Sequence, residues 1–349
     1  MAATTEGIAE VAGLVHDEAL ALRGARIFVT GATGFYGRWL LELLAFLNDR
    51  HALQLAVHGL SRNPDAFAQR APELAAHPMI TWHRGDVNAL SASPTGSLTH
   101  VLHLAAETDA RLYDADPVSE VMTSVEGSRR VAQIARASSA SRVLFASSGA
   151  VYGPQPLDVD RLSEQVRLGP EPTSTVAAHA YGQGKRMAET LLCLEATRAG
   201  SPFSVSLARG FAFSGAHLAL DRHFAIGNFV RDAHAGGPVV VGGDGTPLRS
   251  YLDGADLARW LLVLLVRGGA QRAYNVGSDD AVSIASLAEE AAAFTGVPVV
   301  VRGGPPPAGP VARYVPSIER ARRELGLDVS VPRRESLARM FRALGRRVD

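Results

Sequence analysis

A tyrosine and a lysine four residues apart are well suited to acid–base chemistry. Tyr181 and Lys185 stand in the segment Tyr-Gly-Gln-Gly-Lys, which opens a helical run. Residues four apart share one helix face, so we expect the lysine charge to lower the pKa of the phenol. Such a phenol can exchange a proton near neutral pH. Ser147 or Ser148, at the end of an apolar run, could hydrogen-bond the same substrate oxygen. Decoration of a surface helix is the alternative for the Tyr–Lys pair.

A glycine-rich turn between a strand and a helix predicts a dinucleotide site. Residues 26–37 read Arg-Ile-Phe-Val-Thr-Gly-Ala-Thr-Gly-Phe-Tyr-Gly, and an apolar helical run follows. Gly31 permits a tight turn, Gly34 lets the backbone approach a pyrophosphate, and Gly37 lets helix and strand pack closely. The N–H groups of the helix start then face the phosphates. The full set of expected cofactor residues is Gly31, Thr33, Gly34, Phe35, Tyr36, Gly37, Ser61, Arg62, Asp86, Val87, Leu104, Ala105, Ala106, Tyr181 and Lys185.

The end of the second predicted strand bears on the choice of cofactor. An Asp or Glu near this point accepts the ribose hydroxyls in NAD-binding folds, but residues 53–63 contain no acidic side chain. Ser61 and Arg62 would suit a 2′-phosphate, with Arg62 making charge-assisted hydrogen bonds. The sequence therefore favours NADP over NAD, and a solvated Arg62 at a helix start is the alternative.

The elements that must position these residues alternate between strand and helix. We expect helices at 5–22, 65–76, 117–138 and 181–199, and strands at 27–30, 53–60, 79–83, 99–104 and 142–146. The alternation predicts a doubly wound parallel sheet of the Rossmann type, an α/β fold. We expect an N-terminal helical extension (1–24), an NAD(P)-binding domain (25–210) and a smaller mixed α/β substrate-binding lobe (211–349). From this lobe the chain could cross back to the sheet.

Composition narrows the functional classes. The chain has 349 residues, 35 basic and 35 acidic, and a single cysteine, Cys193. Zero net charge favours neither nucleic acid nor an anionic membrane as a partner. One cysteine excludes an internal disulfide, and we expect no metal site. The start lacks the pattern of a signal peptide, and the most apolar run, 260–266, is too short to span a bilayer. We expect a cytoplasmic protein.

Together, the motifs resemble those of the extended short-chain dehydrogenase/reductase family, the nucleotide-sugar epimerases and dehydratases. The resemblance runs from about residue 25 to 327. Its motifs lie at residues 30–37, 85–86, 103–106, 147–153, 181–185, 242–251 and 274–278. It implies a nucleotide-sugar substrate, and a homodimer that pairs the two long helices of each subunit in a four-helix bundle.

The resemblance also implies residue roles. Tyr181 would be the acid/base, Lys185 would hold the nicotinamide ribose, and Ser148 would bind the reacting hydroxyl or carbonyl. Arg249 matches an arginine that contacts the diphosphate, with a salt bridge to Asp253 or Asp256 as the alternative. The expected substrate contacts are Thr108, Ser147, Ser148, Tyr181, Arg209, Asn228 and Arg249.

Departures from the family pattern bear on the reaction. Family dehydratases carry two carboxyls at the end of the fifth strand, but the matching stretch here is Ser148-Gly149-Ala150. A 4,6-dehydratase is therefore disfavoured. Alanine at 212 and serine at 124 replace usual asparagines. We predict an NAD(P)-dependent epimerase that transfers hydride at a hexose ring carbon, C4. The alternatives are an NADPH-dependent 4-ketosugar reductase, a nucleotide-uronate decarboxylase and a non-catalytic cofactor-binding sensor or scaffold.

Overall fold

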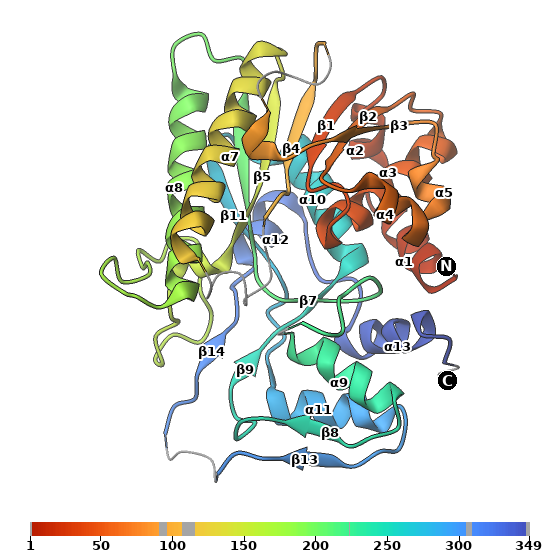
Figure 1. Cartoon of the computed structure of the whole chain (residues 1–349), viewed down its shortest axis with the longest axis vertical. Coiled ribbons are helices and arrows are strands. Elements are labelled where there is room, and N and C mark those ends of the chain that lie inside the picture. The colour runs from red at the N-terminus through yellow and green to blue at the C-terminus, as the bar shows by residue number, and fades with distance from the viewer. Residues whose placement is uncertain (1, 91–95, 107–115, 223, 305–308, 347–349) are drawn as a thin grey trace.

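A seven-stranded parallel sheet with helices on both faces forms the larger part of the molecule (Figure 1). The computed structural model describes residues 2–90, 96–106, 116–222, 224–304 and 309–346. The strand order is β11-β6-β5-β4-β1-β2-β3. The strands are β1 (Arg26–Thr30), β2 (Ala56–Ser61), β3 (Ile80–Arg84), β4 (His100–His103), β5 (Arg142–Ser148), β6 (Ser204–Gly210) and β11 (Arg272–Val276). This order confirms the doubly wound Rossmann-type fold.

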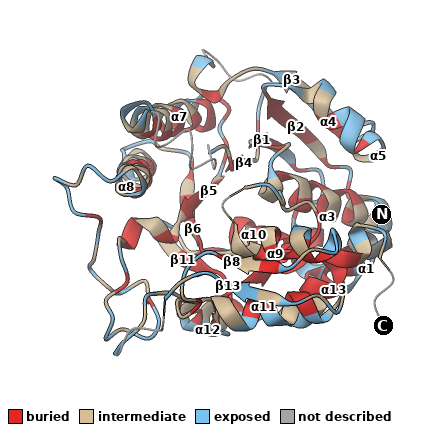
Figure 2. Cartoon of the chain, turned by 60° about the horizontal axis from the view of Figure 1, so that its bottom comes forward, coloured by how far each residue is buried: buried red, intermediate tan, exposed pale blue. Residues whose placement is uncertain are grey.

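Two helical layers bury the two faces of the sheet. Helices α7 (Pro117–Ala137) and α8 (Ala177–Thr197) cover one face, and α3 (Phe35–His51) and α10 (Gly254–Arg267) cover the other (Figure 1). Successive strand residues point to opposite faces. In β1, Ile27 and Val29 pack with α3 and α10, while Phe28 packs in the cluster beneath α7 and α8. Figure 2 shows the sheet buried between these layers.

Two predicted helices are each divided in two. The helix expected at 5–22 is α1 (Ala2–Ala12) and α2 (His16–Ala21), with a turn between them. That turn leaves Leu14 55% exposed, whereas Val15 is buried. The helix expected at 65–76 is α4 (Pro64–Arg70) and α5 (Pro72–Ala75). Proline lacks the N–H that would continue the first helix, so Pro72 starts a new one.

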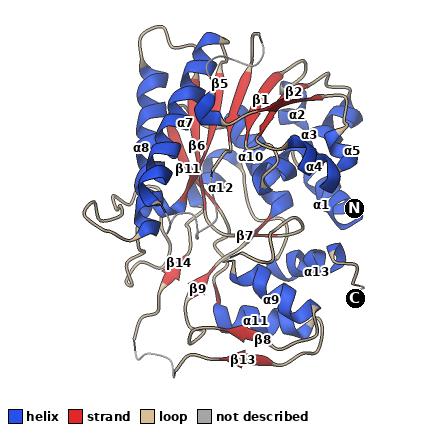
Figure 3. Cartoon of the chain, in the orientation of Figure 1, coloured by secondary structure: helices blue, strands red, loops and turns tan. Residues whose placement is uncertain are grey.

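A second lobe, built from later residues, lies below the sheet in Figure 3. It contains α9 (Ala225–His234) and α11 (Ile284–Ala293), which pack on the strand pair β8 (Val239–Val241) and β13 (Val299–Val301). Short strands complete it: β7 (Phe213–Ser214), β9 (Leu248–Arg249), β10 (Leu252–Asp253), β12 (Val282–Ser283) and β14 (Arg313–Tyr314). Helices α12 (Glu319–Leu325) and α13 (Arg333–Ala343) follow.

The chain crosses between the two parts more than once. After β10 it returns to the sheet as α10 and β11, and then re-enters the lobe at β12. Strand β14 pairs with β9, and just beyond it Leu162 bridges Pro316. The lobe is therefore anchored at the carboxyl ends of β5 and β6, where ligands of open α/β sheets bind. Among the described residues, no helix is both long and apolar enough to cross a bilayer.

Candidate active site

The glycine turn after β1 is a close-packed cradle. Gly31 has φ +68°, and a Cβ there would lie 2.6 Å from the backbone N of Ala105. A Cβ on Gly37 would collide with the backbone of Gly31 and Ala32, so neither glycine can carry a side chain. A Cβ on Gly34 would meet only one atom, 3.4 Å away. Gly34 is also the N-cap of α3 and provides no side-chain cap, so the helix N–H groups remain available to an anion.

The neighbouring strand ends extend this cradle. Thr33 Oγ1 lies 3.1 Å from Ser61 Oγ, which joins the first two strand-to-helix loops. Arg62 is exposed beside them. Asp86 caps a 3₁₀ turn, η1 (Val87–Ala89), by accepting from Asn88 N at 2.8 Å. On the other side, Ala105 N donates to Thr30 Oγ1. Leu104, Ala105 and Val87 thus line the same carboxyl edge as the glycine turn.

Ser148, Tyr181 and Lys185 meet at the end of β5, as their spacing predicted. Ser148 lies within electrostatic reach of the Tyr181 phenol, and its Oγ caps the turn η2 (Gly149–Tyr152) by accepting from Ala150 N at 3.1 Å. Lys185 Nζ donates to Ala146 O at 3.0 Å and lies 5.8 Å from the Tyr181 ring centroid. One helix face and one strand end therefore bring a hydroxyl, a phenol and an ammonium together.

Burial dominates the electrostatics of this group. It raises the pKa of Tyr181 to about 12, although the nearby Ser148 hydroxyl acts in the opposite direction. It lowers the pKa of Lys185 to about 8, because the side chain is only 2% exposed. The expectation that Lys185 brings the phenol pKa below its usual value is therefore wrong. Desolvation of the phenol outweighs the effect of the nearby charge.

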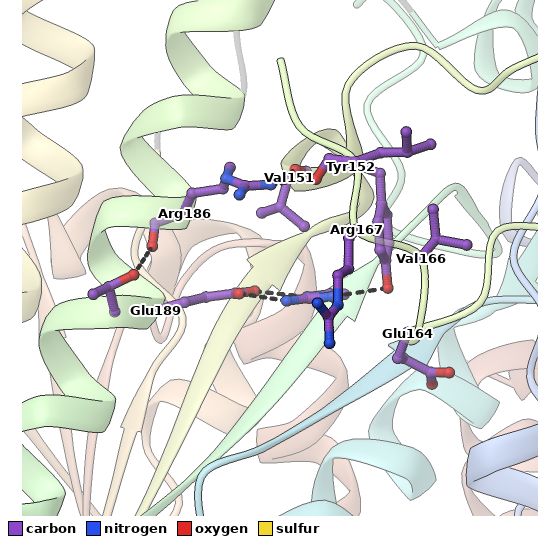
Figure 4. Close-up of a pocket in the computed structure, with 10 residues that line it drawn as sticks. Val151, Tyr152, Glu164, Val166, Arg167, Arg186 and Glu189 are labelled. Atoms are coloured by element: carbon purple, nitrogen blue, oxygen red, sulfur yellow. Dashed lines mark hydrogen bonds and ion pairs between the residues drawn. The ribbon is translucent and has the colours of Figure 1, made fainter. Parts of the chain in front are cut away.

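The neighbouring Ser147 and the predicted substrate residue Arg209 belong to a separate network. Ser147 Oγ donates to Glu189 Oε1 at 2.6 Å, and Arg209 donates to both Glu189 oxygens at 2.9 and 2.7 Å. Arg209 also donates to Tyr152 Oη, which donates to Asn275. This network borders a cavity of about 440 Å³ beside α8 (Figure 4). Ser147 is thus bound to Glu189, two turns further along α8 than Tyr181.

The remaining predicted substrate residues lie in the second lobe. Arg249, on β9, donates to Leu248 O at 2.8 Å and makes no ion pair within the part of the chain that the structure describes. Its suggested partners are taken, since Asp253 accepts from Ser336 and Asp256 from Val331 N. Asn228, on α9, accepts from Arg231. Thr108 lies outside the described residues.

Three residues near the site make contacts that the sequence did not predict. The hydroxyl of Tyr314, on β14, lies against Gly149, and that of Tyr36 lies against Gly210 at the end of β6. Glu120, on α7, is buried within electrostatic reach of Tyr181 and Lys185. Two glycines in the sequence were the available signals for these tyrosines. Gly149 leaves space for the hydroxyl of Tyr314, and Gly210 leaves space for that of Tyr36. In the described ranges, no group of acidic, histidine or cysteine residues could hold a metal ion.

Comparisons with known proteins identify the family to which this chain belongs. The model of the NAD dependent epimerase/dehydratase family matches residues 27–277, most of the chain. The chain belongs to this family of enzymes. Among curated members, it is 27% identical over 317 residues to UDP-glucuronic acid decarboxylase 1 of Arabidopsis thaliana, covering 90% of this chain and 68% of the relative. It is also 27% identical over 321 residues to UDP-glucose 4-epimerase of Mycolicibacterium smegmatis, covering 90% and 96%.

Solved structures of family members share the fold and hold the expected ligands. MoeE5 in complex with UDP-glucose and NAD superposes with a TM-score of 0.74 at 27% identity, over 92% of this chain and 98% of the other. MoeE5 has also been solved with UDP-glucuronic acid and NAD, and superposes with a TM-score of 0.75. The UDP-glucose 4-epimerase of Thermotoga maritima, at 19% identity and a TM-score of 0.75, shares the fold.

Proposed function

We propose that this protein is an NAD(P)-dependent nucleotide-sugar epimerase that inverts a hexose ring carbon, C4. The observation that carries the proposal is the cluster of Ser148, Tyr181 and Lys185 at the carboxyl edge of the sheet, beside the glycine turn. Relatives named as UDP-glucose 4-epimerase and as UDP-glucuronic acid decarboxylase support a uridine diphosphate sugar as the substrate class.

The described residues fit a dinucleotide. Gly31 and Gly37 admit no side chain, Gly34 leaves the backbone open, and the first turn of α3 has no side-chain cap. Gly31, Gly34 and Gly37 would therefore hold the pyrophosphate, and Lys185 the nicotinamide ribose. When bound, the cofactor would take a hydride from the sugar carbon and return it.

The residues of the chain would manage the accompanying proton. Tyr181 would accept the proton of the C4 hydroxyl and later give it back to the carbonyl oxygen. Ser148 would hydrogen-bond the same oxygen, because it lies at the same strand end within electrostatic reach of Tyr181. Lys185 would favour the phenolate form of Tyr181 by its charge. Arg249, with no ion pair within the described chain, would meet a diphosphate on the lobe side.

A uronate decarboxylase is the second candidate, since several curated relatives carry that name. The strand end argues against it and against a dehydratase. Gly149 and Ala150 carry no carboxyl there, and a Cβ on Gly149 would lie 2.5 Å from Tyr314 Oη. Glu189 is nearby but is already bound by Ser147 and Arg209. Release of carbon dioxide from UDP-glucuronic acid would decide for the decarboxylase.

For the cofactor, we favour NADP, although the solved neighbours hold NAD. Arg62 is exposed at the end of β2, next to the hydroxyl of Ser61. Arg84, the strand partner of Ser61, places a second guanidinium nearby, donating to the Arg62 carbonyl and pairing with Asp65. Two guanidinium groups at this edge suit a 2′-phosphate better than a bare ribose.

We also propose a homodimer formed through α7 and α8. Their outer surfaces expose Met122, Met187 and Leu194, large apolar side chains that a monomer rarely leaves in water. A second copy of the same two helices would cover them around a two-fold axis, which is the commonest closed symmetry. The packing of α7 against α8 within one subunit gives half of the expected four-helix bundle.

Incubation of the purified protein with UDP-glucose tests the proposed reaction. We expect conversion to the C4 epimer with no net consumption of added cofactor, and loss of this conversion in Tyr181→Phe. Consumption of NADPH in proportion to product would favour the ketoreductase. Equal turnover by the wild type and Tyr181→Phe would overturn the catalytic role of Tyr181. A complete lack of turnover by the wild type would favour the non-catalytic, cofactor-binding sensor or scaffold.

A further inference from the structure

A cavity of about 440 Å³ lies beside the catalytic helix α8 and is separate from the proposed active site. Its walls come from α8, from β6, from η2 and from the irregular segment 153–176 that follows η2 (Figure 4). The glycine turn, Ser148, Tyr181 and Lys185 do not line it. Its volume falls in the range of small-molecule sites, about 300–1,000 Å³. The proposed function therefore leaves this cavity without a role.

Two glutamates and one arginine in the cavity wall already have partners. Arg209 and Glu189 neutralise each other through hydrogen bonds of 2.9 and 2.7 Å. Glu164 is engaged by β11 and α12: its Oε1 accepts from Asn275 N at 2.8 Å, and its Oε2 lies 3.9 Å from Arg320 Nε. Neither carboxylate is therefore left to balance a further positive charge in the cavity.

The two remaining arginines of the cavity have no acidic partner. Arg186, on α8, donates through Nη1 to Val151 O at 2.9 Å and to Leu168 O. Its guanidinium lies along Gly169, where a Cβ would come within 2.6 Å of Nη1, so two carbonyls and a glycine fix its place. Arg167 lines the same cavity from segment 153–176 and makes no hydrogen bond or ion pair with any described residue (Figure 4). Within the described chain, the cavity thus holds two uncompensated positive charges.

We propose that this cavity binds the phosphate group of a small phosphomonoester between Arg167 and Arg186. A phosphomonoester carries a charge of about −1.5 to −2 at neutral pH, which matches the two unpaired guanidinium groups. The planar fork of arginine suits the oxygens of a phosphate, to which it makes charge-assisted hydrogen bonds. Val151 and Val166, which also line the cavity, would contact the organic part of the ligand. The proposal goes beyond the proposed function and does not depend on it.

A ligand at this place would join segment 153–176 to the catalytic helix. Arg167 belongs to the segment, and Arg186 directly follows Lys185 on α8. A phosphate held by both would bridge the two elements and relieve the repulsion between two like charges. Because it binds the folded chain only, it would also raise the unfolding temperature as its concentration rises.

Calorimetric titration with glucose 1-phosphate tests the site, with glucose as the uncharged counterpart, in a phosphate-free buffer of low ionic strength. We expect the wild type to bind glucose 1-phosphate and not glucose. Arg167→Met should weaken this binding about tenfold or more, the size of a hydrogen bond to a charged group. Arg167 contacts no described residue, so this variant should keep the unfolding temperature of the wild type. Arg161→Met is the matched control, because Arg161 is an exposed arginine of the same segment that lies outside the cavity, and it should bind as the wild type does.

Two further variants make the outcome decisive. Arg249→Met reports on binding at the proposed diphosphate site and should retain glucose 1-phosphate. Arg167→Glu places a carboxylate in the cavity with Arg186, so at low salt it should unfold at a higher temperature than the wild type and gain nothing from the ligand. Absence of binding by the wild type, or binding that survives Arg167→Met but is lost in Arg249→Met, would overturn the proposal. The titration needs no turnover, so a failure of the proposed epimerase activity would show separately.

Discussion

The ion pair between Arg209 and Glu189 should stabilise the fold rather than bind substrate. Arg209 donates hydrogen bonds to both carboxylate oxygens of Glu189, and the side chains of Arg209 and Glu189 are only 17% and 9% exposed. Glu189 lies one turn after Lys185 on α8 and also accepts the Ser147 hydroxyl. The pair therefore ties the catalytic helix to the ends of β5 and β6.

The expected magnitude follows from that burial. Removing one partner of a buried pair costs about 3–5 kcal/mol, because the other charge is left uncompensated. Arg209 keeps some contact with water, so we expect about 3 kcal/mol from Arg209→Met and a similar loss from Glu189→Leu. The double variant leaves no unpaired charge. It should lose clearly less than the roughly 6 kcal/mol sum of the single losses.

Chemical denaturation of the four proteins measures this coupling. Arg231→Met is a suitable control, because Arg231 pairs with Asp232 at an exposed site and should change the unfolding free energy by under about 1 kcal/mol. If Arg209 instead contacts the substrate, as the sequence predicted, Arg209→Met should change KM rather than the unfolding free energy. A higher KM in Arg209→Met with an unfolding free energy within about 0.5 kcal/mol of the wild type would refute our reasoning.

Three further outcomes can be checked. Arg62→Ala should abolish a preference for NADP over NAD in binding titrations, while Arg70→Ala, on the exposed side of α4, should not; tighter NAD binding by the wild type would contradict the cofactor proposal. Because the pKa of Lys185 is lowered to about 8, its charge is lost as pH rises through that value, so kcat/KM should decline above about pH 8 and Lys185→Arg should move this decline to higher pH. Met187→Glu should give a monomer by light scattering, whereas Val300→Glu, at an exposed apolar site in the other lobe, should leave a dimer.

The fold could be predicted because each of its main elements is specified by a short stretch of sequence. The apolar strands, the glycine turn and the long helices each carry a pattern that a short window reveals, and the strand order confirmed the doubly wound class. The errors came from single residues that interrupt a pattern. Leu14 continues a helical spacing but stands in a turn, and Pro72 divides a helix that its alanine-rich neighbours favour.

The candidate site was predictable only where its residues share an element. Tyr181 and Lys185 lie on one helix, so spacing alone brought them together. Ser147 and Ser148 could not be told apart without the partners that each faces, Glu189 and Tyr181. Tyr314 reaches Gly149 only through the pairing of β14 with β9, a contact across more than 160 positions of sequence that no local pattern encodes.

The central claim is that Tyr181 exchanges the proton of a sugar hydroxyl at this site. The most direct measurement is the rate of C4 inversion of UDP-glucose and UDP-glucuronic acid by the wild type and by Tyr181→Phe, with products identified by mass and chromatography. The account predicts an epimer of unchanged mass, formed about 10²–10⁴-fold more slowly by Tyr181→Phe. Equal rates in the two proteins, or a product that has lost carbon dioxide, would contradict it.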